Sequence, residues 1–332
     1  MLQSADIVAG LAWGDEGKGK ITSYLASSGK YNMVCRWAGG SNAGHTVYLE
    51  NKKYKTHIIP SGIFHGLPSI IGPGCVINKS SFYKELDYLH KEGFDITLVK
   101  VSPKAHMVKE DHIFYDQKRL APALGTTGSG IAPAYADKAA RCGIRAEEVL
   151  PKGVIWDEKL TGNILCEGAQ GVWLDLDWGN YPYVTSSTTL PYGACSLGIP
   201  PQKINNVYGV AKIYDTRSGT DPMFPESLLE DKILSLLGEY GQEIGVTTGR
   251  KRKVQWLDLD RLIVSTNITG TTHLIINKCD ILEMLDIYKI IYNGKLAQFN
   301  NLRDMCSFIE ARIHDNCPLT QVTKFSSSPE NL

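Results

Sequence analysis

Apolar residues along the chain gather into short continuous runs, and glycine-rich or polar segments follow most of them. At the N-terminus, an apolar run over residues 6–11 precedes a glycine-rich turn, and Ile21, Tyr24 and Leu25 then recur at helical spacing before Gly29. This order predicts a strand, a loop and a helix. Comparable apolar runs, each leading into a polar or glycine-rich segment, occupy residues 32–40, 69–78, 205–217 and 272–282.

The alternation of these buried runs with helical segments such as residues 80–93 predicts an α/β fold. Its core would be a largely parallel central sheet with helices on both faces. Functional loops of such a fold belong at the carboxyl ends of the strands. The sequence contains no internal repeat, low-complexity tract or long Pro/Ser-rich linker. We therefore expect a single domain over residues 1–332 with long active-site loops.

Composition sets limits on partners and compartment. The 332 residues are 43% hydrophobic, enough for a sizeable core, and 35 Lys and Arg balance 35 Asp and Glu. Zero net charge argues against nucleic acid or an anionic membrane as a partner. The eight cysteines form no CxxC pair, which favours reduced thiols. Because Gly10, Trp13 and Gly14 interrupt the N-terminal apolar run, it suits neither a signal peptide nor a membrane span, and we expect a cytoplasmic protein.

The first glycine-rich loop, "GDEGKGK", spans residues 14–20 between the predicted strand and helix. Its backbone N–H groups and the helix N-terminus can hold a phosphate, although the spacing is not that of a Walker A loop. A Gly/Lys turn by itself is common in proteins without this role. Asp15 and Lys18 favour the functional interpretation, because a carboxylate there can bind Mg²⁺ or take a proton and an ammonium can offset phosphoryl charge.

Two further glycine loops carry candidate side chains. In "GGSNAGHT", His45 is either a surface histidine or an acid that stabilises a transferring phosphoryl group, and Asn42 lies beside it. The segment "GTTGSGIAPAYADKAARCG" offers hydroxyls and amides that suit a monophosphate, among them Thr127, and Arg141 could bind the same phosphate through two hydrogen bonds. The alternative for this segment is an ordinary Thr/Gly connection before a surface helix.

Later polar turns supply groups that fit a purine and a dicarboxylic acid. "EGAQG" and "YPYVTSSTT" place Gln170 and Thr185 after an apolar run, and a Gln side chain has both the donor and the acceptor that a purine edge requires. "GVTTGRKRK" concentrates Arg250 and Arg252 behind two threonines. Such a run is commonly a solvated basic turn, but two guanidiniums beside glycine loops could also bind the carboxylates of a small dicarboxylate.

The last motif, an N-K-x-D arrangement, ends a buried apolar run. It consists of Asn277, Lys278 and Asp280. An Asp carboxylate there can accept from N1–H and from the exocyclic amine of guanine, while the Lys stem covers the ring. The motif is short enough to recur by chance, but its place after phosphate-binding loops favours a guanine nucleotide.

Taken in order, these motifs resemble adenylosuccinate synthetase from about Asp6 to the C-terminus. The segments that carry the resemblance are "WGDEGKGK", "GGSNAGHT", "HIIPSGIF", "GTTGSGIAPAY", "EGAQG", "YPYVTSSTT", "VTTGRKRK" and "NKCD". The resemblance implies a homodimeric ligase of purine biosynthesis that uses Mg²⁺ and GTP, or ATP in its place, to join L-aspartate to a purine nucleoside monophosphate. Arg141 would then reach the active site of the neighbouring subunit.

The resemblance also implies roles for individual residues. Catalysis would fall to Asp15 as base, His45 as acid and Gln170, with Asp15 and the Gly44 carbonyl at the metal. The triphosphate would be bound by Gly14, Glu16, Gly17, Lys18, Gly19, Lys278, Asp280 and Ser327. The acceptor nucleotide would be bound by Asn42, Thr127, Arg141, Gln170, Thr185, Ser218 and Asp221, and aspartate by Thr247, Thr248, Arg250 and Arg252.

The implied reaction has two steps. Asp15 removes the N1 proton of the purine, and the exposed O6 attacks the γ-phosphate of GTP to give a 6-phosphoryl intermediate. The amine of aspartate then displaces phosphate, while Mg²⁺, Lys18 and His45 offset the charge.

Three features depart from the common pattern of the family. The stretch between "GIRAEEVL" and "NILCEGAQG" is short, as in compact archaeal and phage forms. Ser218 and Asp221 stand where the family has valine and glycine, and Gln255 where a glycine is usual. A carboxylate at position 221 could accept from a 2-amino group, so the acceptor is either IMP or, as in phage 2-aminoadenine synthesis, GMP or dGMP. Alternatively, Asp221 caps a neighbouring turn and IMP remains the substrate.

A function of a different class is a GTP-binding regulatory module that hydrolyses or senses GTP without ligating anything. The N-K-x-D segment fits such a module. The absence of a Walker A loop and the presence of Arg250 and Arg252 do not.

Overall fold

Eight strands form the central sheet, and every neighbouring pair in it is parallel. The computed structural model describes residues 1–245 and 249–328, and the sheet lies within these residues. Its strand order is β16 (Val322–Phe325), β13 (His273–Asn277), β10 (Ile204–Lys212), β1 (Leu2–Gly10), β9 (Gly162–Glu167), β2 (Met33–Arg36), β5 (Ser69–Ile71) and β7 (Val99–Val101). The predicted α/β fold with a parallel sheet is confirmed.

Alternate residues of β1 face opposite sides of this sheet, and both sides are covered. Ala5, Ile7 and Ala9 pack in one apolar cluster, whereas Val8 packs with Ile21 of helix α1 (Lys18–Ala26) in another. On the side away from α1, β13 packs against α7 (Leu259–Thr269) and α9 (Leu302–Asn316). Each fully buried aliphatic side chain contributes about 1.5–3 kcal/mol, which explains why parallel strands covered on both sides are apolar throughout.

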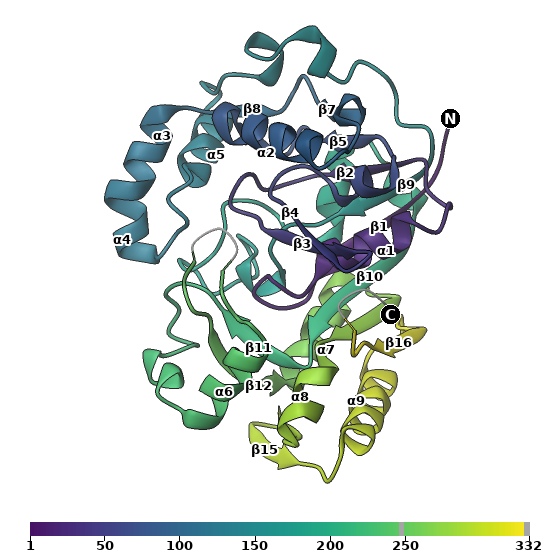
Figure 1. Ribbon diagram of the computed structural model, residues 1–332, viewed down its shortest axis with the longest axis vertical. Helices are drawn as coiled ribbons and strands as arrows, with labels where there is room; N and C mark the ends of the chain where they lie inside the picture. Colours follow the sequence, from purple (N-terminus) through teal and green to yellow (C-terminus); the bar gives the residue numbers. More distant parts are fainter. Residues whose placement is uncertain (246–248, 329–332) are drawn as a thin grey trace.

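A second sheet, which the apolar pattern did not predict, lies below the first in Figure 1. Its strand order is β11 (Tyr214–Arg217), β12 (Lys253–Asp258), β14 (Lys289–Tyr292) and β15 (Lys295–Gln298). The apolar run over residues 205–217, which we expected to be one strand, divides here into β10 and β11, and β11 pairs antiparallel with β12. Continuous apolar character cannot reveal where a chain passes from one sheet to the next, because both strands are buried.

The run over residues 69–78 divides in the same way, into β5 and β6 (Val76–Asn78). The chain between them passes so close to its neighbour that a Cβ on Gly74 would lie 1.9 Å from the Trp37 carbonyl oxygen. Strand β6 pairs with β8 (His106–Val108), and β3 (His45–Leu49) forms a hairpin with β4 (Lys52–Thr56).

The other regular elements are α-helices, which loops and short 3-10 or π turns connect to the strands. The helix predicted over residues 80–93 is α2 (Lys79–Lys91), and its N-cap Asn78 accepts a hydrogen bond from the Ser81 backbone N–H at 2.8 Å. The other helices are α3 (Glu110–Tyr115), α4 (Ala121–Leu124), α5 (Ile131–Ala140), α6 (Lys232–Tyr240) and α8 (Cys279–Leu285). No helix among the described residues is long and apolar enough to cross a membrane.

Candidate active site

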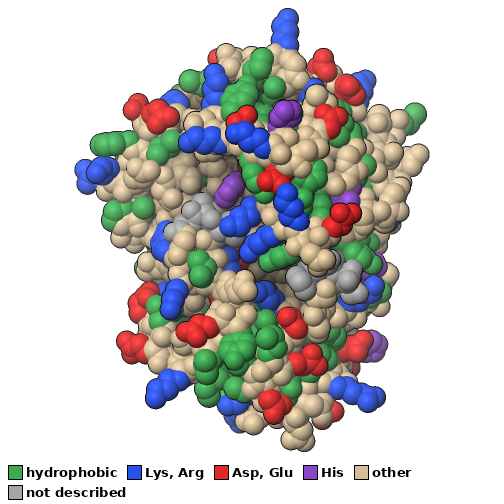
Figure 2. Space-filling view, in the orientation of Figure 1, with side chains coloured by type: hydrophobic (Ala, Val, Ile, Leu, Met, Phe, Trp, Pro, Cys, Tyr) green, Lys and Arg blue, Asp and Glu red, His purple; other side chains and the backbone are tan. Residues whose placement is uncertain are grey.

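One cleft of about 820 Å³ lies where the strands of the central sheet end. Figure 2 shows Lys and Arg side chains, with a histidine, gathered across the middle of this face. The cleft is lined by most of the predicted site residues: Gly14, Asp15, Glu16, Gly17, Lys18, Gly19, Asn42, Gly44, His45, Thr127, Gln170, Thr185, Ser218, Arg250, Arg252, Lys278 and Asp280. Arg141, Asp221 and Ser327 are not among its lining residues, and Thr247 and Thr248 lie outside the described part of the chain.

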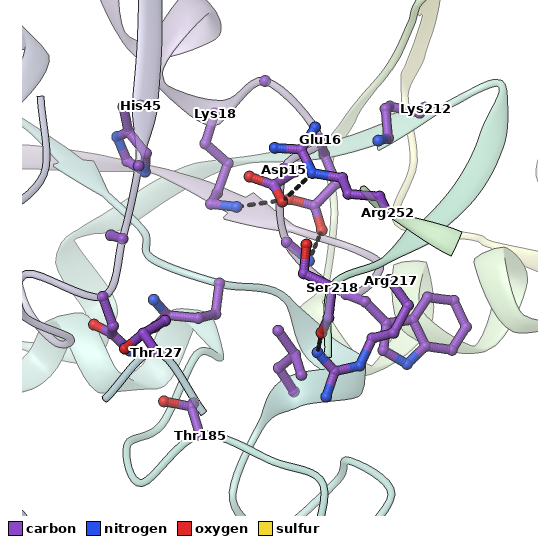
Figure 3. Close-up of a pocket in the computed structure, with 18 of the residues that line it drawn as sticks. Asp15, Glu16, Lys18, His45, Thr127, Thr185, Lys212, Arg217, Ser218 and Arg252 are labelled. Atoms are coloured by element: carbon purple, nitrogen blue, oxygen red, sulfur yellow. Dashed lines mark hydrogen bonds and ion pairs between the residues drawn. The ribbon is translucent and has the colours of Figure 1, made fainter. Parts of the chain in front are cut away.

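The loop between β1 and α1, which we call the phosphate loop after its predicted role, is held in shape by the buried carboxylate of Glu16. One of its oxygens accepts from the backbone N–H groups of Ala12 at 3.1 Å and Gly14 at 2.8 Å, and the other pairs with Lys18 Nζ at 2.6 Å. The Glu16 side chain therefore organises the phosphate loop and directs Lys18, as Figure 3 shows. We expected it to contact the triphosphate directly, but its oxygens are already engaged by the loop.

Two glycines of the same loop allow other parts of the site to approach closely. Gly17 has φ +97°, and a Cβ there would lie 2.9 Å from Asn277 Nδ2. A Cβ on Gly19 would lie 2.7 Å from the Cβ of His45. Asn277 in turn donates to the backbone carbonyl of Glu16 at 2.8 Å. The N-K-x-D segment and the histidine strand are therefore fixed directly against the phosphate loop.

Asp15 faces a guanidinium across the cleft. Its carboxylate lies 2.9 Å from Arg252 Nε (Figure 3). Arg252 Nη1 lies 2.6 Å from the buried carboxylate of Glu243. Asp15 has φ +62°, an unusual conformation for a residue other than glycine. The predicted base and a predicted aspartate-binding arginine thus contact each other without substrates.

His45 is oriented by Glu167, a residue that the sequence did not single out. His45 Nδ1 contacts Glu167 Oε1, and Ser61 donates to the same carboxylate through its backbone N–H at 2.7 Å and its hydroxyl at 2.8 Å. Burial lowers the pKa of His45, against the opposing effect of Glu167. Burial alone would raise the pKa of Glu167, but His45 and Arg36 hold it below its usual value. Glu167 therefore remains an anion that fixes the histidine ring.

The cleft lining also includes buried polar atoms that have no hydrogen-bond partner among the described residues. They include Gln170 Oε1, Ser218 Oγ and Trp13 Nε1. A buried acceptor or donor without a partner costs about 1–3 kcal/mol, so such atoms are typical of places where a ligand completes the hydrogen bonds. Asn42, Thr127 and Thr185 line the same region.

Asp221 does not face this region, which corrects the expectation that its carboxylate contacts the purine. It is buried, and it accepts from Asn180 Nδ2 at 2.9 Å and from the Met223 backbone N–H at 3.0 Å. It also pairs with Arg217 Nε at 3.4 Å. The carboxylate thus caps a turn and neutralises a buried arginine. Arg217, which the sequence did not single out, lines the cleft in its place.

The two arginines predicted to bind aspartate have different settings. Arg250 is exposed and donates to the carbonyls of Gly125 at 3.2 Å and Thr126 at 2.7 Å, so it joins its own loop to the predicted phosphate-binding loop. Arg252 is largely buried between Asp15 and Glu243. Arg141 lies on the exposed surface at the end of α5, outside the cleft.

Lys20 is a further cleft residue that the sequence interpretation missed. Its ammonium donates to Asn277 Oδ1 at 3.1 Å, Ser326 Oγ at 2.6 Å and the Ser328 carbonyl at 2.6 Å. Burial lowers its pKa to about 8, while Asp280 acts to raise it. Lys20 thereby joins the phosphate loop to the C-terminal segment, where Ser328 lines the cleft and Ser327 does not.

A magnesium site fits the groups at the phosphate loop. Among the described residues no three His, Cys, Asp or Glu side chains are grouped so as to hold a metal ion by themselves. Mg²⁺ bound with a nucleotide needs no such group, because it commonly takes one or two carboxylates and completes its shell with phosphate oxygens and water. Asp15 and the Gly44 carbonyl, both lining the cleft, provide protein ligands of the right kind.

A glycine-rich phosphate loop, an acidic and basic cluster and an N-K-x-D segment in one cleft define an α/β enzyme that uses nucleotides. Comparison with known proteins shows the family to which this enzyme belongs. The adenylosuccinate synthetase family profile matches residues 7–162 and 154–311. Adenylosuccinate synthetase of Brevibacillus brevis is 39% identical over 89% of this chain and 82% of its own, and that of Streptococcus gordonii 36% identical over 98% and 90%.

Solved structures agree. Fully ligated adenylosuccinate synthetase from Plasmodium falciparum superposes with a TM-score of 0.81 at 27% identity, covering 98% of both chains. Cyanophage S-2L succinoaminodeoxyadenylate synthetase, bound to dGMP and dATP, has a TM-score of 0.70 over 94% of this chain and 99% of its own, but at 20% identity it shows the shared fold alone. The chain belongs to the adenylosuccinate synthetase family. It is a ligase of purine biosynthesis, which replaces the regulatory GTP-binding module as an interpretation.

Proposed function

We propose that this enzyme joins L-aspartate to C6 of IMP at the expense of GTP, through a 6-phosphoryl intermediate, to give adenylosuccinate. The observation that carries the proposal is the single cleft in which Asp15, His45, Gln170, Arg252 and Asp280 all lie. The three substrates require a proton acceptor, a histidine that faces the phosphate, an amide for the purine, a cation for the aspartate carboxylates and a carboxylate for guanine.

The first step depends on Asp15. A lactam oxygen is a weak nucleophile until N1 is deprotonated, and Asp15 is the carboxylate at the tip of the phosphate loop that reaches into the cleft. Gln170, with its buried and unpartnered Oε1, is suited to hold the purine edge in line with it. Removal of the proton by Asp15 lets O6 attack the γ-phosphate.

Charge on the transferring phosphoryl group is offset from two sides. Lys18, directed by Glu16, approaches from the phosphate loop, and His45, directed by Glu167, approaches from β3. Mg²⁺ held by Asp15, the Gly44 carbonyl and the phosphates would supply further electrostatic stabilisation when bound. Burial lowers the pKa of His45, so its charged form depends on Glu167 and on the negative phosphoryl group; once protonated, the ring donates Nδ1–H to Glu167 and Nε2–H to the phosphate.

Aspartate would be bound by Arg250 and Arg252, together with Thr247 and Thr248 from the part of the loop that the structure does not describe. Arg252 is the pivotal residue, because it already pairs with one carboxylate of the site. A substrate carboxylate arriving there would exchange with Asp15 for the guanidinium. The amine of aspartate would then lie beside C6 and displace phosphate.

IMP is the acceptor that the geometry favours. The carboxylate proposed to recognise a 2-amino group, Asp221, is buried and satisfied by other donors. One observation keeps GMP or dGMP as a second candidate: Ser218 Oγ lines the cleft, is buried and has no partner among the described residues, so it could accept from a 2-amino group. We also propose a single domain, and a homodimer in which the exposed Arg141 reaches the partner's acceptor phosphate.

Phosphate release by the purified protein tests the proposal. With GTP, Mg²⁺, aspartate and IMP, phosphate and adenylosuccinate should form in equal amounts, and omission of aspartate or IMP should abolish release. Parallel reactions with dIMP, GMP and dGMP, and with ATP for GTP, determine acceptor and donor. Release of phosphate from GTP alone, or a lack of any condensation product with every acceptor, would refute the proposed reaction.

A further inference from the structure

A buried carboxylate beneath the cleft, Glu243, joins residues from three separate parts of the site. It follows α6, and its side chain is about 1% exposed. Its Oε2 lies 2.6 Å from Arg252 Nη1. Its Oε1 lies 3.2 Å from Lys212 Nζ, 3.7 Å from Lys278 Nζ and accepts from the Tyr214 hydroxyl at 2.8 Å. Three cations of the cleft wall thus share one counterion.

Each of these cations belongs to a different part of the fold. Arg252 belongs to the loop proposed to bind aspartate, and it also contacts Asp15. Lys278 is the Lys of the N-K-x-D segment proposed to bind guanine, between β13 and α8. Lys212 ends β10, a strand next to β1 in the central sheet. Glu243 therefore joins the loops proposed to bind aspartate and guanine to the end of a central strand.

The backbone around Glu243 fixes this arrangement. Its carbonyl accepts from the Arg252 backbone N–H at 3.0 Å, and Ile244 and Lys251 form an isolated antiparallel bridge just above it. Glu243 and Arg252 consequently face each other at the base of the loop that carries Arg250.

Burial of a carboxylate is costly unless cations and donors surround it. Burial acts to raise the pKa of Glu243, but Lys212, Arg252 and Lys278 together lower it to about 2. The carboxylate is therefore charged whenever the enzyme works. Without the Glu243 charge, the three cations would lose their shared counterion. Among the described residues, Asp15 would then be the one carboxylate still paired with Arg252.

We propose that Glu243 is a positioning residue for the ligase reaction, which holds Arg252 for aspartate and Lys278 for the guanine nucleotide from one buried carboxylate. This inference rests on the proposed substrates. It predicts that loss of the Glu243 charge weakens aspartate and GTP together, although their binding residues lie on different loops. The residues proposed to bind the acceptor, among them Gln170 and Thr185, make no hydrogen bond or ion pair with Glu243 in the described part of the chain, so the KM for IMP should change little.

The test compares Glu243→Gln with a matched control, Glu226→Gln. Glu226 also pairs with a lysine, Lys253 at 2.8 Å, but its side chain is 77% exposed and does not line the cleft. In Glu243→Gln, the KM for aspartate should rise roughly ten-fold or more, because the charge-assisted hydrogen bond to Arg252 is lost. The KM for GTP should rise by a smaller factor, about three-fold, because Lys278 loses an ion pair at 3.7 Å but keeps its hydrogen bond to the Gly241 carbonyl. The KM for IMP should stay within about two-fold. Glu226→Gln should match the wild type, and Glu243→Asp should recover part of the loss.

A double variant separates positioning from a general loss of structure. If Glu243 acts on aspartate through Arg252, then in an Arg252→Leu background Glu243→Gln should raise the aspartate KM no further, yet still raise the GTP KM. Tyr214→Phe removes only the hydroxyl that donates to Glu243 and keeps the ring, so it should fold and show the same paired changes at smaller size. It supplies the test if Glu243→Gln does not fold.

The outcomes distinguish this inference from the proposed function. If the wild type does not condense aspartate with a purine nucleotide, the proposed function fails first. If the wild type is active but Glu243→Gln raises all three KM values equally, or only one of them, the shared positioning role is refuted. Unchanged kinetics in Glu243→Gln and Tyr214→Phe would refute it as well.

Discussion

Replacement of Glu167 by Gln should separate the orientation of His45 from the stability of the fold. The carboxylate accepts from His45 Nδ1 and twice from Ser61 at 2.7 and 2.8 Å, and it is fully buried. An amide keeps the volume but has one acceptor oxygen. If that oxygen keeps the Ser61 backbone N–H, the amide N–H₂ faces His45 Nδ1, which must then accept.

The magnitude follows from the hydrogen bond that is lost. A neutral His45 with its proton on Nε2 still donates to a phosphate, but without the imidazolium charge that Glu167 supports. A charge-assisted hydrogen bond contributes about 1.5–3 kcal/mol, so kcat should fall roughly ten- to 150-fold. If His45 acts on the transferring phosphoryl group, as we propose, the KM values for IMP and aspartate should change little.

The assay is steady-state kinetics with a stability measurement on the same samples. Glu85→Gln is the matched control, because Glu85 is also buried and accepts from the backbone N–H groups of His57 at 2.7 Å and Ile59 at 3.1 Å, away from the cleft. Both variants should lose stability, and only Glu167→Gln should lose kcat. A kcat within two-fold of wild type for Glu167→Gln, or an equal loss in both variants, would show that Glu167 does not serve His45.

Four further predictions follow from the contacts described above. Asp221→Gly should lower the free energy of unfolding by about 3–5 kcal/mol, because Arg217 is left buried without its carboxylate partner. The ratio of kcat/KM for IMP to kcat/KM for dGMP should not change, and a changed ratio would show that Asp221 takes part in acceptor recognition. Arg252→Leu should raise the aspartate KM about ten-fold or more, and an unchanged KM in a folded protein would contradict its role. Asp280→Asn should raise the GTP KM and bring GTP and ATP closer as donors, whereas equal use of both by the wild type would contradict guanine recognition. Burial raises the pKa of Asp215 to about 7, so folding favours its protonated form and the free energy of unfolding should decline as pH rises from about 4 to 7. Asp215→Asn can still accept from the Asp258 backbone N–H and should remove up to roughly 4 kcal/mol of that decline. Parallel stability curves for the variant and the wild type over this pH range would contradict the prediction.

The central sheet could be predicted because its strands are continuous apolar runs that end in glycine or polar loops. The second sheet could not, since β10 and β11 form one apolar run and the change of sheet depends on pairing with β12, a segment nearly forty residues later in the chain. Strand pairing between distant segments leaves no local signal in one sequence.

Site residues divide in a similar way. Asp15, His45 and Gln170 were predictable, since each lies in a polar or glycine-rich loop after a strand, and the cleft brings them together. Glu167 and Lys212 are charged residues at the ends of apolar strands, a signal that was present in the sequence but not used. The sequence left two interpretations of Asp221 open, because sequence alone does not show which neighbour a carboxylate faces. In the structure its carboxylate pairs with Arg217 and caps a local turn.

The central claim, that O6 of the purine is phosphorylated and leaves as phosphate when aspartate attacks C6, can be tested by following one oxygen atom. IMP labelled with ¹⁸O at O6 is converted with GTP, Mg²⁺ and aspartate, and the phosphate released is analysed by mass spectrometry. A 6-phosphoryl intermediate requires that the P–O6 bond survives and the C6–O6 bond breaks, so every phosphate should carry one ¹⁸O from IMP. Unlabelled phosphate formed alongside the condensation product would contradict the proposed chemistry.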